Sequence, residues 1–354
     1  MRIINNKLKI SMTSDDGLFL KKIINQINKE DFLIIDKCLM NKYLFMKKIH
    51  KKYKDRILIV EGSEKIKTIK EYSKLIEKII NIGINRNSKL YSFGGGTVGD
   101  LSGFVASTVL RGVEHIMIPT TLLAMVDSSI GGKTGVNSQY GKNLIGTFYL
   151  PKSVMINTNF LKKLPLRELS CGFAEIIKYS FIEDKKLKKI LINNSINQGL
   201  KEINIKAIIE RSINTKLKFI KDFREIKFDR YSRAILNFGH TFAHAVENLN
   251  LYKNNIKHGE AVALGMIIEI KISQLLGFEP NSEETLIKIL NNFNLSIDYK
   301  KFISKRNINL IFEKIYRDKK SFDKKIKLIL IKKDRGIVNE IQIDKLKKLT
   351  LRLI

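Results

Sequence analysis

The sequence has few cysteines and no long apolar run, and each absence excludes a class of protein. Its 354 residues include two cysteines, Cys38 and Cys171, too few for a disulfide framework and with no partner at metal-ligand spacing. No apolar run reaches the length of a transmembrane helix. The first residues, MRIINNKLKI, lack the apolar segment of a signal peptide. We therefore expect a cytoplasmic globular protein with no membrane partner.

Acidic residues are scarce relative to basic ones. The chain has 35 Asp and Glu against 65 Lys and Arg, a formal net charge of +30, which is a reason to consider nucleic-acid binding. The lysines, however, are spread along the whole chain between isoleucines and asparagines, as in LKKILINNSIN, and no recognition motif is present. This pattern favours a solvated basic surface and no nucleic-acid partner. The alternative, a nucleic-acid-binding protein, predicts affinity that falls steeply with salt.

Short apolar runs alternate with amphipathic stretches in the first half of the chain. The runs at 8–12, 32–35, 57–60, 90–93, 115–118 and 154–156 predict strands, with helices between them. Such alternation is typical of a Rossmann-like parallel sheet with helices on both faces. After Pro165 the patterns are helical up to an expected hairpin within 326–343. We expect an α/β domain over 1–163 and an all-α domain over 164–354.

Three glycines follow the expected strand at 90–93. Gly94, Gly96 and Gly99 have the G-x-G-x-x-G spacing and precede a helical run over 101–110. In this context glycines let the backbone approach a pyrophosphate at the N-terminus of the helix. The acidic residue that usually ends the next strand is missing, so a tight turn that needs small residues is an equal alternative.

Polar residues gather in the loops after these glycines. They are hydroxyls, lysines, an aspartate and an asparagine, namely Thr120, Thr121, Asp127, Lys133, Lys142 and Asn143. Such loops at strand ends suit an anionic, polyhydroxylated ligand beside a nucleotide. GGKT resembles the end of a P-loop, but the first glycine of that motif would fall at Asp127, which excludes a P-loop ATPase.

The second half of the chain holds a possible metal site. Three of the five histidines, His240, His244 and His258, lie close together in the sequence. The spacing of His240 and His244 places them on one helix face and nominates this pair as ligands. Glu175 and Lys178 interrupt the apolar segment CGFAEIIKY and are costly to bury unless paired or liganding. Histidines plus one carboxylate indicate a catalytic zinc site. The alternative is one capping and one core histidine with an unrelated glutamate.

Six ordered motifs resemble one family. GGGTVGDLSGF, IPTTLLAMVDSSIGGKTGVN, GKNLIGTFY, LSCGFAEIIKYSFI, RAILNFGHTFAHAVE and KHGEAVALGM are similar to segments of 3-dehydroquinate synthase. The resemblance implies an NAD-binding α/β domain followed by a helical metal- and substrate-binding domain, and a homodimer. It implies zinc or cobalt held by Glu175, His240 and His258. His244 then becomes a contact to the substrate phosphate or a proton-transfer group.

The resemblance also implies two sets of contacts. The NAD contacts would be Glu64, Lys67, Gly96, Thr97, Val98, Gly99, Asp100, Thr120, Thr121, Lys133, Lys142, Phe160, Leu161, Lys162 and Lys163. The substrate and catalytic contacts would be Arg111, Asp127, Lys133, Asn143, Lys178, Lys216, Arg233, Asn237 and His244. One of Lys319 and Lys320 would join them. We expect a short insertion within 223–232 relative to the family.

The implied substrate is a phosphorylated sugar acid, 3-deoxy-D-arabino-heptulosonate 7-phosphate. The implied reaction oxidises a ring hydroxyl with NAD, eliminates phosphate, returns the hydride and closes a new ring by an intramolecular aldol step. NAD is regenerated in each turnover. A related sugar-phosphate cyclase or a metal-dependent polyol dehydrogenase is the alternative within the same fold. Arg233, Asn237 and His244 suit a substrate with both a carboxylate and a phosphate, which favours the synthase.

Overall fold

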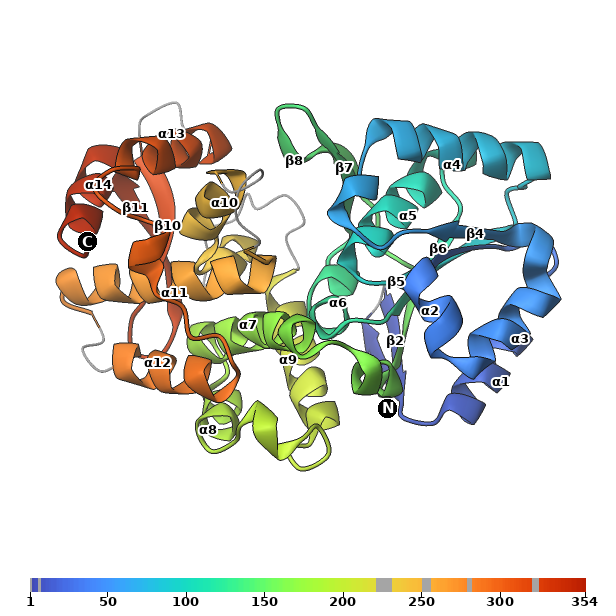
Figure 1. Ribbon diagram of the computed structural model, residues 1–354, viewed down its shortest axis with the longest axis horizontal. Helices are drawn as coiled ribbons and strands as arrows, with labels where there is room; N and C mark the ends of the chain where they lie inside the picture. Colours follow the sequence, from blue (N-terminus) through green and yellow to red (C-terminus); the bar gives the residue numbers. More distant parts are fainter. Residues whose placement is uncertain (1, 6–7, 221–230, 250–255, 279–281, 320–324) are drawn as a thin grey trace. The chain divides into compact units, whose positions relative to one another are not determined.

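The computed structural model of the chain describes residues 2–5, 8–220, 231–249, 256–278, 282–319 and 325–354. The chain folds into two compact units, Met1–Leu169 (unit 1) and Ser170–Ile354 (unit 2) (Figure 1). None of the helices in these described ranges combines the length and the apolarity that a membrane span requires. The expected insertion within 223–232 falls almost wholly outside them.

Unit 1 is built on a seven-stranded sheet. Its spatial order is β1-β2-β9-β6-β5-β3-β4. The strands are β1 (Arg2–Asn5), β2 (Leu8–Thr13), β3 (Phe32–Asp36), β4 (Ile57–Val60), β5 (Lys89–Gly94), β6 (Glu114–Pro119) and β9 (Ser153–Asn157). All neighbours pair in parallel except β1, which runs antiparallel to β2. The predicted parallel sheet is confirmed. Sequence reasoning missed β1, because four residues are too few to show a period of two.

Helices cover both faces of this sheet. They are α1 (Asp16–Gln26), α2 (Lys37–Lys42), α3 (Leu44–Tyr53), α4 (Ile69–Ile82), α5 (Gly96–Thr108) and α6 (Leu122–Val126). Figure 1 shows α4 and α5 on one face and α1, α2 and α3 on the other. Phe32 and Ile34 of β3 pack with Leu101 and Val105 of α5 in one buried cluster. Burial on both faces explains why the strands read as continuous apolar runs rather than alternating ones.

The order of the strands predicts where unit 1 would bind a ligand. From β3 the chain crosses to β4 on one side, whereas from β5 it proceeds through β6 to β9 on the other. Ligands of open parallel sheets bind at the carboxyl ends of strands where the order reverses in this way. Here that point lies between Asp36, which ends β3, and Gly94, which ends β5.

The segment read from the sequence as polar loops forms a hairpin instead. β7 (Lys133–Ser138) pairs antiparallel with β8 (Gly141–Phe148). Its glycines and asparagines are turn-type residues, so the composition concealed the strands. Gly135 and Gly146 are required there, because a Cβ at Gly146 would lie 2.0 Å from the carbonyl oxygen of Thr134. At these two positions the backbones of β7 and β8 approach too closely for a side chain to fit between them.

Unit 2 is mainly helical. Its helices are α7 (Leu166–Ile182), which begins in unit 1, α8 (Lys185–Ile192), α9 (Ile205–Phe219), α10 (His240–Leu249), α11 (His258–Leu275), α12 (Ser282–Asn292), α13 (Ile308–Lys319) and α14 (Ile343–Leu351). The expected hairpin is β10 (Lys325–Ile331) with β11 (Gly336–Gln342). Phe242 of α10 and Ile268 of α11 lie in a core with Ile311 of α13 and Leu328 of β10. The predicted helical second region is confirmed.

The sequence over 233–249 reads as one continuous helix, but the structure divides it. Arg233–Asn237 is a short 3-10 helix, and α10 begins only at His240. Between them Gly239 adopts a left-handed φ of 80°, which favours glycine. The carboxylate of Glu269 on α11 accepts a hydrogen bond from its N–H at 2.8 Å. This tertiary contact replaces the helical hydrogen bond that a continuous helix would have needed.

A histidine that no functional prediction uses lies inside the sheet of unit 1. His115 on β6 is 1% exposed, and its Nε2 is 2.9 Å from Oγ of Ser92 on β5. Burial lowers its pKa to about 3. The native state therefore keeps this ring neutral at a pH where the unfolded chain takes up a proton.

We predict that His115 makes unit 1 sensitive to acid. Its folded pKa lies below the unfolded value, so its contribution to stability is present above about pH 6.5 and is lost as pH falls toward 3. Between pH 6.5 and 4 the loss is about 3 kcal/mol in the free energy of unfolding. Urea titrations should show a flatter pH dependence for His115→Gln, whereas Ser92→Ala should keep the wild-type slope. Equal slopes in all three proteins would refute the prediction.

Candidate active site

Three helices of unit 2 bring one carboxylate and two imidazoles together. Glu175 comes from α7, and His240 and His258 are the first residues of α10 and α11. Their potential ligand atoms lie within 4.8 Å of one another. Nε2 of each histidine is 3.6 Å from Oε1 of Glu175. Among the residues that the structure describes, this is the one group of at least three such side chains with that spacing.

Close backbone contacts allow the three helices to meet. A Cβ at Gly259 would lie 2.4 Å from Cα of Cys171, one turn before Glu175 on α7. A Cβ at Gly265 would lie 1.8 Å from the carbonyl oxygen of Gly239. Both positions therefore require glycine. The first contact lets the start of α11 pack against α7. The second lets the residue before α10, Gly239, pack against α11.

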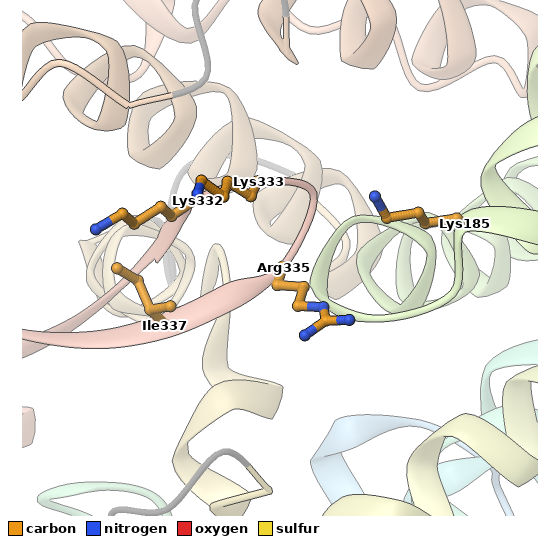
Figure 2. Close-up of a pocket in the computed structure, with 5 residues that line it drawn as sticks. All are labelled: Lys185, Lys332, Lys333, Arg335 and Ile337. Atoms are coloured by element: carbon orange, nitrogen blue, oxygen red, sulfur yellow. The ribbon is translucent and has the colours of Figure 1, made fainter.

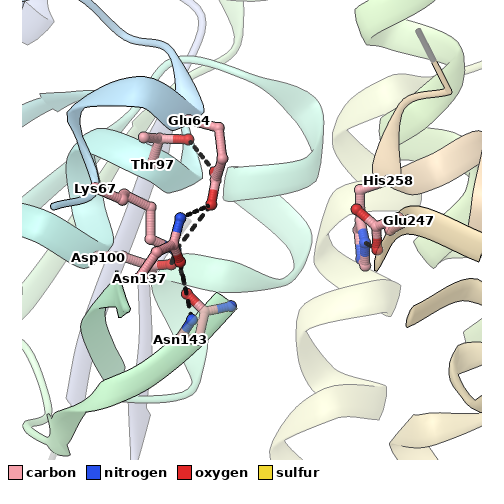
Figure 3. Close-up of polar contacts among 8 residues, drawn as sticks. All are labelled: Glu64, Lys67, Thr97, Asp100, Asn137, Asn143, Glu247 and His258. Atoms are coloured by element: carbon pink, nitrogen blue, oxygen red, sulfur yellow. Dashed lines mark hydrogen bonds and ion pairs between the residues drawn. The ribbon is translucent and has the colours of Figure 1, made fainter. Parts of the chain in front are cut away.

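The second nitrogen of each imidazole has a partner of its own. Nδ1 of His240 is 3.1 Å from the carbonyl oxygen of Phe238, and Nδ1 of His258 is 3.1 Å from Oε2 of Glu247 (Figure 3). An acceptor at Nδ1 selects the tautomer whose Nε2 presents a lone pair, as in carboxylate–histidine–metal triads. Sequence reasoning missed Glu247. Its signal was a position two turns after His240 on the same helix.

The charges around Glu175 compensate one another. Lys178 contacts Oε2 of Glu175, and both side chains are buried. Burial, assisted by Lys178, holds the pKa of His240 well below its usual value. For His258 burial also lowers the pKa, but the carboxylates of Glu247 and Glu175 outweigh it and raise the pKa to about 10. Oε1 of Glu175 thus faces one neutral imidazole and one that carries a proton which a divalent cation would replace.

The remaining predicted residues of unit 2 lie on several elements. The ring of His244 is 5.5 Å from that of His240 and 6.5 Å from that of His258, and it is not part of the three-residue cluster. Lys216 on α9 is 5% exposed, and Arg233 is 3% exposed on the 3-10 helix that Asn237 ends. Lys320 and the side chain of Lys319 lie outside the described part of the chain.

The glycine turn of unit 1 opens a helix whose N-terminus carries no side-chain cap. Gly94 ends β5, Gly95 is the N-cap of α5, and Gly96 is its first residue. A Cβ at Gly94 would lie 2.6 Å from Cβ of Val98, and one at Gly99 would lie 2.5 Å from Cε of Met117. The glycines thus permit close packing of strand and helix. Because no side chain caps them with a hydrogen bond, the first N–H groups of α5 suit a phosphate.

A network of polar side chains lies beside this helix (Figure 3). Nζ of Lys67 is 2.8 Å from Oδ2 of Asp100 and 3.9 Å from Oε1 of Glu64, and it donates to Oδ1 of Asn143. Thr97 Oγ1 lies 3.4 Å from Oε2 of Glu64. Burial raises the pKa of Asp100, and the ammonium of Lys67 opposes that shift. Three segments of unit 1, the turn that holds Glu64 and Lys67, helix α5 and strand β8, therefore meet around one buried lysine.

Other predicted cofactor contacts have side chains or backbone groups that already bind within the protein. The N–H of Thr120 donates to the carbonyl of Gly94 at 2.9 Å, and Oγ1 of Thr121 caps α6. Phe160 is 1% exposed, and its ring packs edge-on against Tyr43. Such residues can offer a ligand their backbone more readily than their side chains.

The remaining predicted NAD and substrate contacts of unit 1 lie on several of its elements. Val98 and Leu161 are buried, Lys162, Lys163, Arg111 and Lys133 are exposed, and Asp127 and Lys142 are partly exposed. Asp127 is the C-cap of α6, and Lys133 and Lys142 lie on the two strands of the β7–β8 hairpin. Arg111 has a left-handed φ of 67°. The hairpin therefore carries three predicted contacts, with Asn143 as the third.

A cavity elsewhere in unit 2 contains none of the predicted site residues. Its volume is about 370 Å³, and it is lined by Lys185, Lys332, Lys333, Arg335 and Ile337 (Figure 2). Asp334 forms ion pairs with Lys185 at 3.1 Å and with Lys188 at 2.8 Å. In a chain of net charge +30 such a group of cations is expected on the surface, and we assign it no role.

Comparison with known proteins places the chain in a family. The family model for the N-terminal part of 3-dehydroquinate synthase matches residues 57–171, and the model for its C-terminal part matches residues 172–321. The 3-dehydroquinate synthase of Pelagibacter ubique (strain HTCC1062) is 41% identical over 353 residues, 95% of each chain. That of Dictyoglomus thermophilum is 43% identical over 283 residues, 78% of this chain and 76% of its own.

Solved structures share the fold. The 2-epi-5-epi-valiolone synthase of Streptomyces hygroscopicus subsp. jinggangensis 5008, with NAD+ and Zn2+ bound, has a TM-score of 0.84 at 21% identity and covers 99% of this chain and 98% of its own. A 2-deoxy-scyllo-inosose synthase complexed with carbaglucose-6-phosphate, NAD+ and Co2+ has a TM-score of 0.79 at 25% identity, covering 98% and 96%. With both halves of the family model matched and relatives above 40% identity, the chain belongs to the 3-dehydroquinate synthase family.

Proposed function

We propose that this protein converts 3-deoxy-D-arabino-heptulosonate 7-phosphate into 3-dehydroquinate and phosphate, with catalytic NAD and one divalent metal ion, zinc or cobalt. The observation that carries the proposal is the meeting of Glu175, His240 and His258 from three helices in a chain of this family. The proposal also takes the glycine turn and the Lys67 network of unit 1 as the place where the dinucleotide would bind.

The donor set suits a borderline divalent cation. One carboxylate oxygen and two imidazole nitrogens match the three-ligand sets of catalytic zinc sites, which leave a position for water or substrate. Oε2 of Glu175 is held by Lys178, so Oε1 is the oxygen that faces both histidines. Glu247 and the carbonyl of Phe238 would keep the two rings in the liganding orientation.

The features of unit 1 suit NAD. The N-terminus of α5 would hold the pyrophosphate, and the carboxylates of Glu64 and Asp100 beside Lys67 offer acceptors for ribose hydroxyls. Phe160–Lys163 would line the site mainly through backbone, since the Phe160 ring is in the core. When bound, NAD supplies a hydride acceptor that returns the hydride, and the metal ion supplies a Lewis acid.

The chain's own contribution is charge and orientation. The substrate carries a carboxylate and a phosphate, and Lys178, Lys216 and Arg233 present buried cations in unit 2. We assign His244 to the substrate phosphate or to proton transfer, and Asn237 to a substrate contact. From unit 1 we assign Arg111, Asp127, Lys133 and Asn143 to the substrate, and Lys133 and Lys142 to NAD. These groups bind, orient and stabilise negative charge, so most of the rate enhancement would come from positioning.

We predict phosphate release in excess of NAD. Purified protein with the heptulosonate phosphate, zinc or cobalt, and NAD well below the substrate concentration should release many phosphates per NAD and form dehydroquinate, because NAD is regenerated. A chelator should stop the release. Steady NADH accumulation on polyols without phosphate release would instead assign the protein to the dehydrogenase alternative.

We predict that Glu175→Gln and His258→Ala remove the bound metal, as measured by elemental mass spectrometry of the purified protein. Each substitution deletes one of three donors. Glu247→Gln should lower metal affinity by about tenfold to a hundredfold, because it only releases the His258 ring. Glu168→Gln, two turns earlier on α7, is the matched control and should keep the wild-type metal content. Full metal content in both donor variants, with circular dichroism unchanged, would refute the assignment.

We also propose that the protein is a cytoplasmic homodimer. One exposed apolar row supports the dimer. Leu144 and Phe148 lie on one face of β8, at 57% and 53% exposure, and Tyr140 at the hairpin turn is 85% exposed. Within the described part of the chain β8 pairs only with β7. A second protomer packed on this face of the hairpin would cover these side chains.

Sedimentation equilibrium should give about twice the chain mass of 40.8 kDa. Leu144→Lys should shift the equilibrium toward monomer by placing a charge in the contact. Leu18→Lys, at an exposed leucine on α1, is the control and should leave the mass unchanged. A wild-type mass of one chain would contradict the dimer, and an unchanged Leu144→Lys dimer would place the contact elsewhere.

A further inference from the structure

One side chain of the β7–β8 hairpin makes contacts that neither the motifs nor the family comparison assign. Asn137 lies on β7 where the register shifts between Val136 and Ser138, and it is half-buried. Its backbone N–H donates to the carbonyl of Lys67 at 2.8 Å, as part of an isolated parallel bridge between Thr68 and Asn137. The irregular register thus turns Asn137 toward the segment after β4.

The side-chain amide of Asn137 joins two of the predicted site residues. Nδ2 donates to Oε1 of Glu64 at 2.7 Å, and Oδ1 accepts from the backbone N–H of Asn143 at 2.8 Å (Figure 3). Glu64 is expected among the NAD contacts and Asn143 among the substrate contacts. Asn137 therefore touches both sets at once.

The two partners determine the orientation of the amide. An ionised carboxylate only accepts hydrogen bonds, and a backbone N–H only donates them. The donor end of Asn137 must therefore face Glu64 and the acceptor end must face Asn143. Aspartate would supply the acceptor without the donor, and alanine would supply neither. The site requires a short side chain with one of each.

Both partners depend on this amide for their position. The side chain of Glu64 is 44% exposed, and its other contacts are longer, 3.4 Å to Thr97 and 3.9 Å to Lys67. Asn143 is exposed and has a left-handed φ of 56°, an uncommon conformation for a residue with a side chain. In that conformation its Oδ1 accepts from Lys67. Lys67 thus holds the side chain of Asn143, whereas Asn137 holds its backbone N–H.

We propose that Asn137 is a positioning residue that sets the Glu64 carboxylate for NAD and holds the Asn143 backbone, so that the cofactor contact and the substrate-binding hairpin are aligned together. The inference rests on the proposed function, because it takes Glu64 as an NAD contact. Asn137 acts through its neighbours and touches no reacting atom.

The test is a double-substitution cycle on full-length protein, with NAD affinity measured by calorimetry. Asn137→Asp keeps the acceptor for Asn143 but puts a carboxylate against Glu64, so NAD binding should weaken at least about tenfold. In the Glu64→Gln background the amide at position 64 donates to the new carboxylate. There the same Asn137→Asp change should weaken NAD binding less than about twofold.

Hydrogen exchange of the hairpin peptide gives the second readout. Asn137→Ala loses both partners, so exchange over 137–148 should become faster by at least about tenfold, together with weaker NAD binding. Asn137→Asp should keep wild-type exchange, because the bond to Asn143 remains. Ser138→Ala is the matched control. Its Oγ caps only Tyr140 within the hairpin turn, so NAD affinity should not change.

The outcomes separate this inference from the proposed function. If wild-type protein binds NAD and Asn137→Asp weakens binding equally in both backgrounds, or not at all, the inference is wrong. If wild-type protein binds no NAD, the proposed function fails and the cofactor role of Asn137 fails with it. In that case faster exchange in Asn137→Ala would show that only the contact with Asn143 is real. A rise in KM for substrate with little change in kcat is expected of the Asn137→Ala enzyme.

Discussion

The arrangement of unit 2 depends on one buried carboxylate. Glu175 is 0% exposed on a helix whose neighbouring positions are apolar, and an uncompensated carboxylate there would cost several kcal/mol. Lys178 on the same helix and His240 and His258 from two others provide the compensation. These partners can reach Glu175 only if α7, α10 and α11 approach at backbone distance, which Gly259 and Gly265 permit. The metal site proposed for this protein depends on the same close approach of the three helices.

Unit 1 likewise depends on one buried charge, which is positive rather than negative. The ammonium of Lys67 is 4% exposed and is met by Asp100 from α5, Asn143 from β8 and, at longer range, Glu64. The buried charge of Lys67 is thus compensated by residues from segments far apart in the sequence. Because these partners belong to the glycine-turn helix and to the hairpin, one ion pair and its hydrogen bonds connect the expected cofactor contacts to the expected substrate contacts.

Local patterns were sufficient for the layers of the fold but not for its irregular parts. Apolar runs buried on both sheet faces predicted β3, β5 and β6 because periodicity depends only on neighbouring residues. The β7–β8 hairpin was not predicted, since its glycines serve close backbone approach rather than turns. The break at Gly239 was not predicted either. Apart from Gly239, the pattern over 233–249 fits one helix, and the break depends on contacts with α11, the Glu269 carboxylate and the close approach at Gly265.

The sequence alone determined the six strands of the parallel sheet with the helices between them, the glycine turn that opens α5, and, with the family motifs, the residues able to bind a metal ion. Spacing by itself paired His240 with His244. The tertiary structure instead placed His240 and His258 at the starts of two helices that converge on Glu175. It also decided that Glu247 and Asn137 orient their neighbours. Helical periodicity specifies which residues share a face, whereas contacts between distant segments depend on how the helices and strands pack.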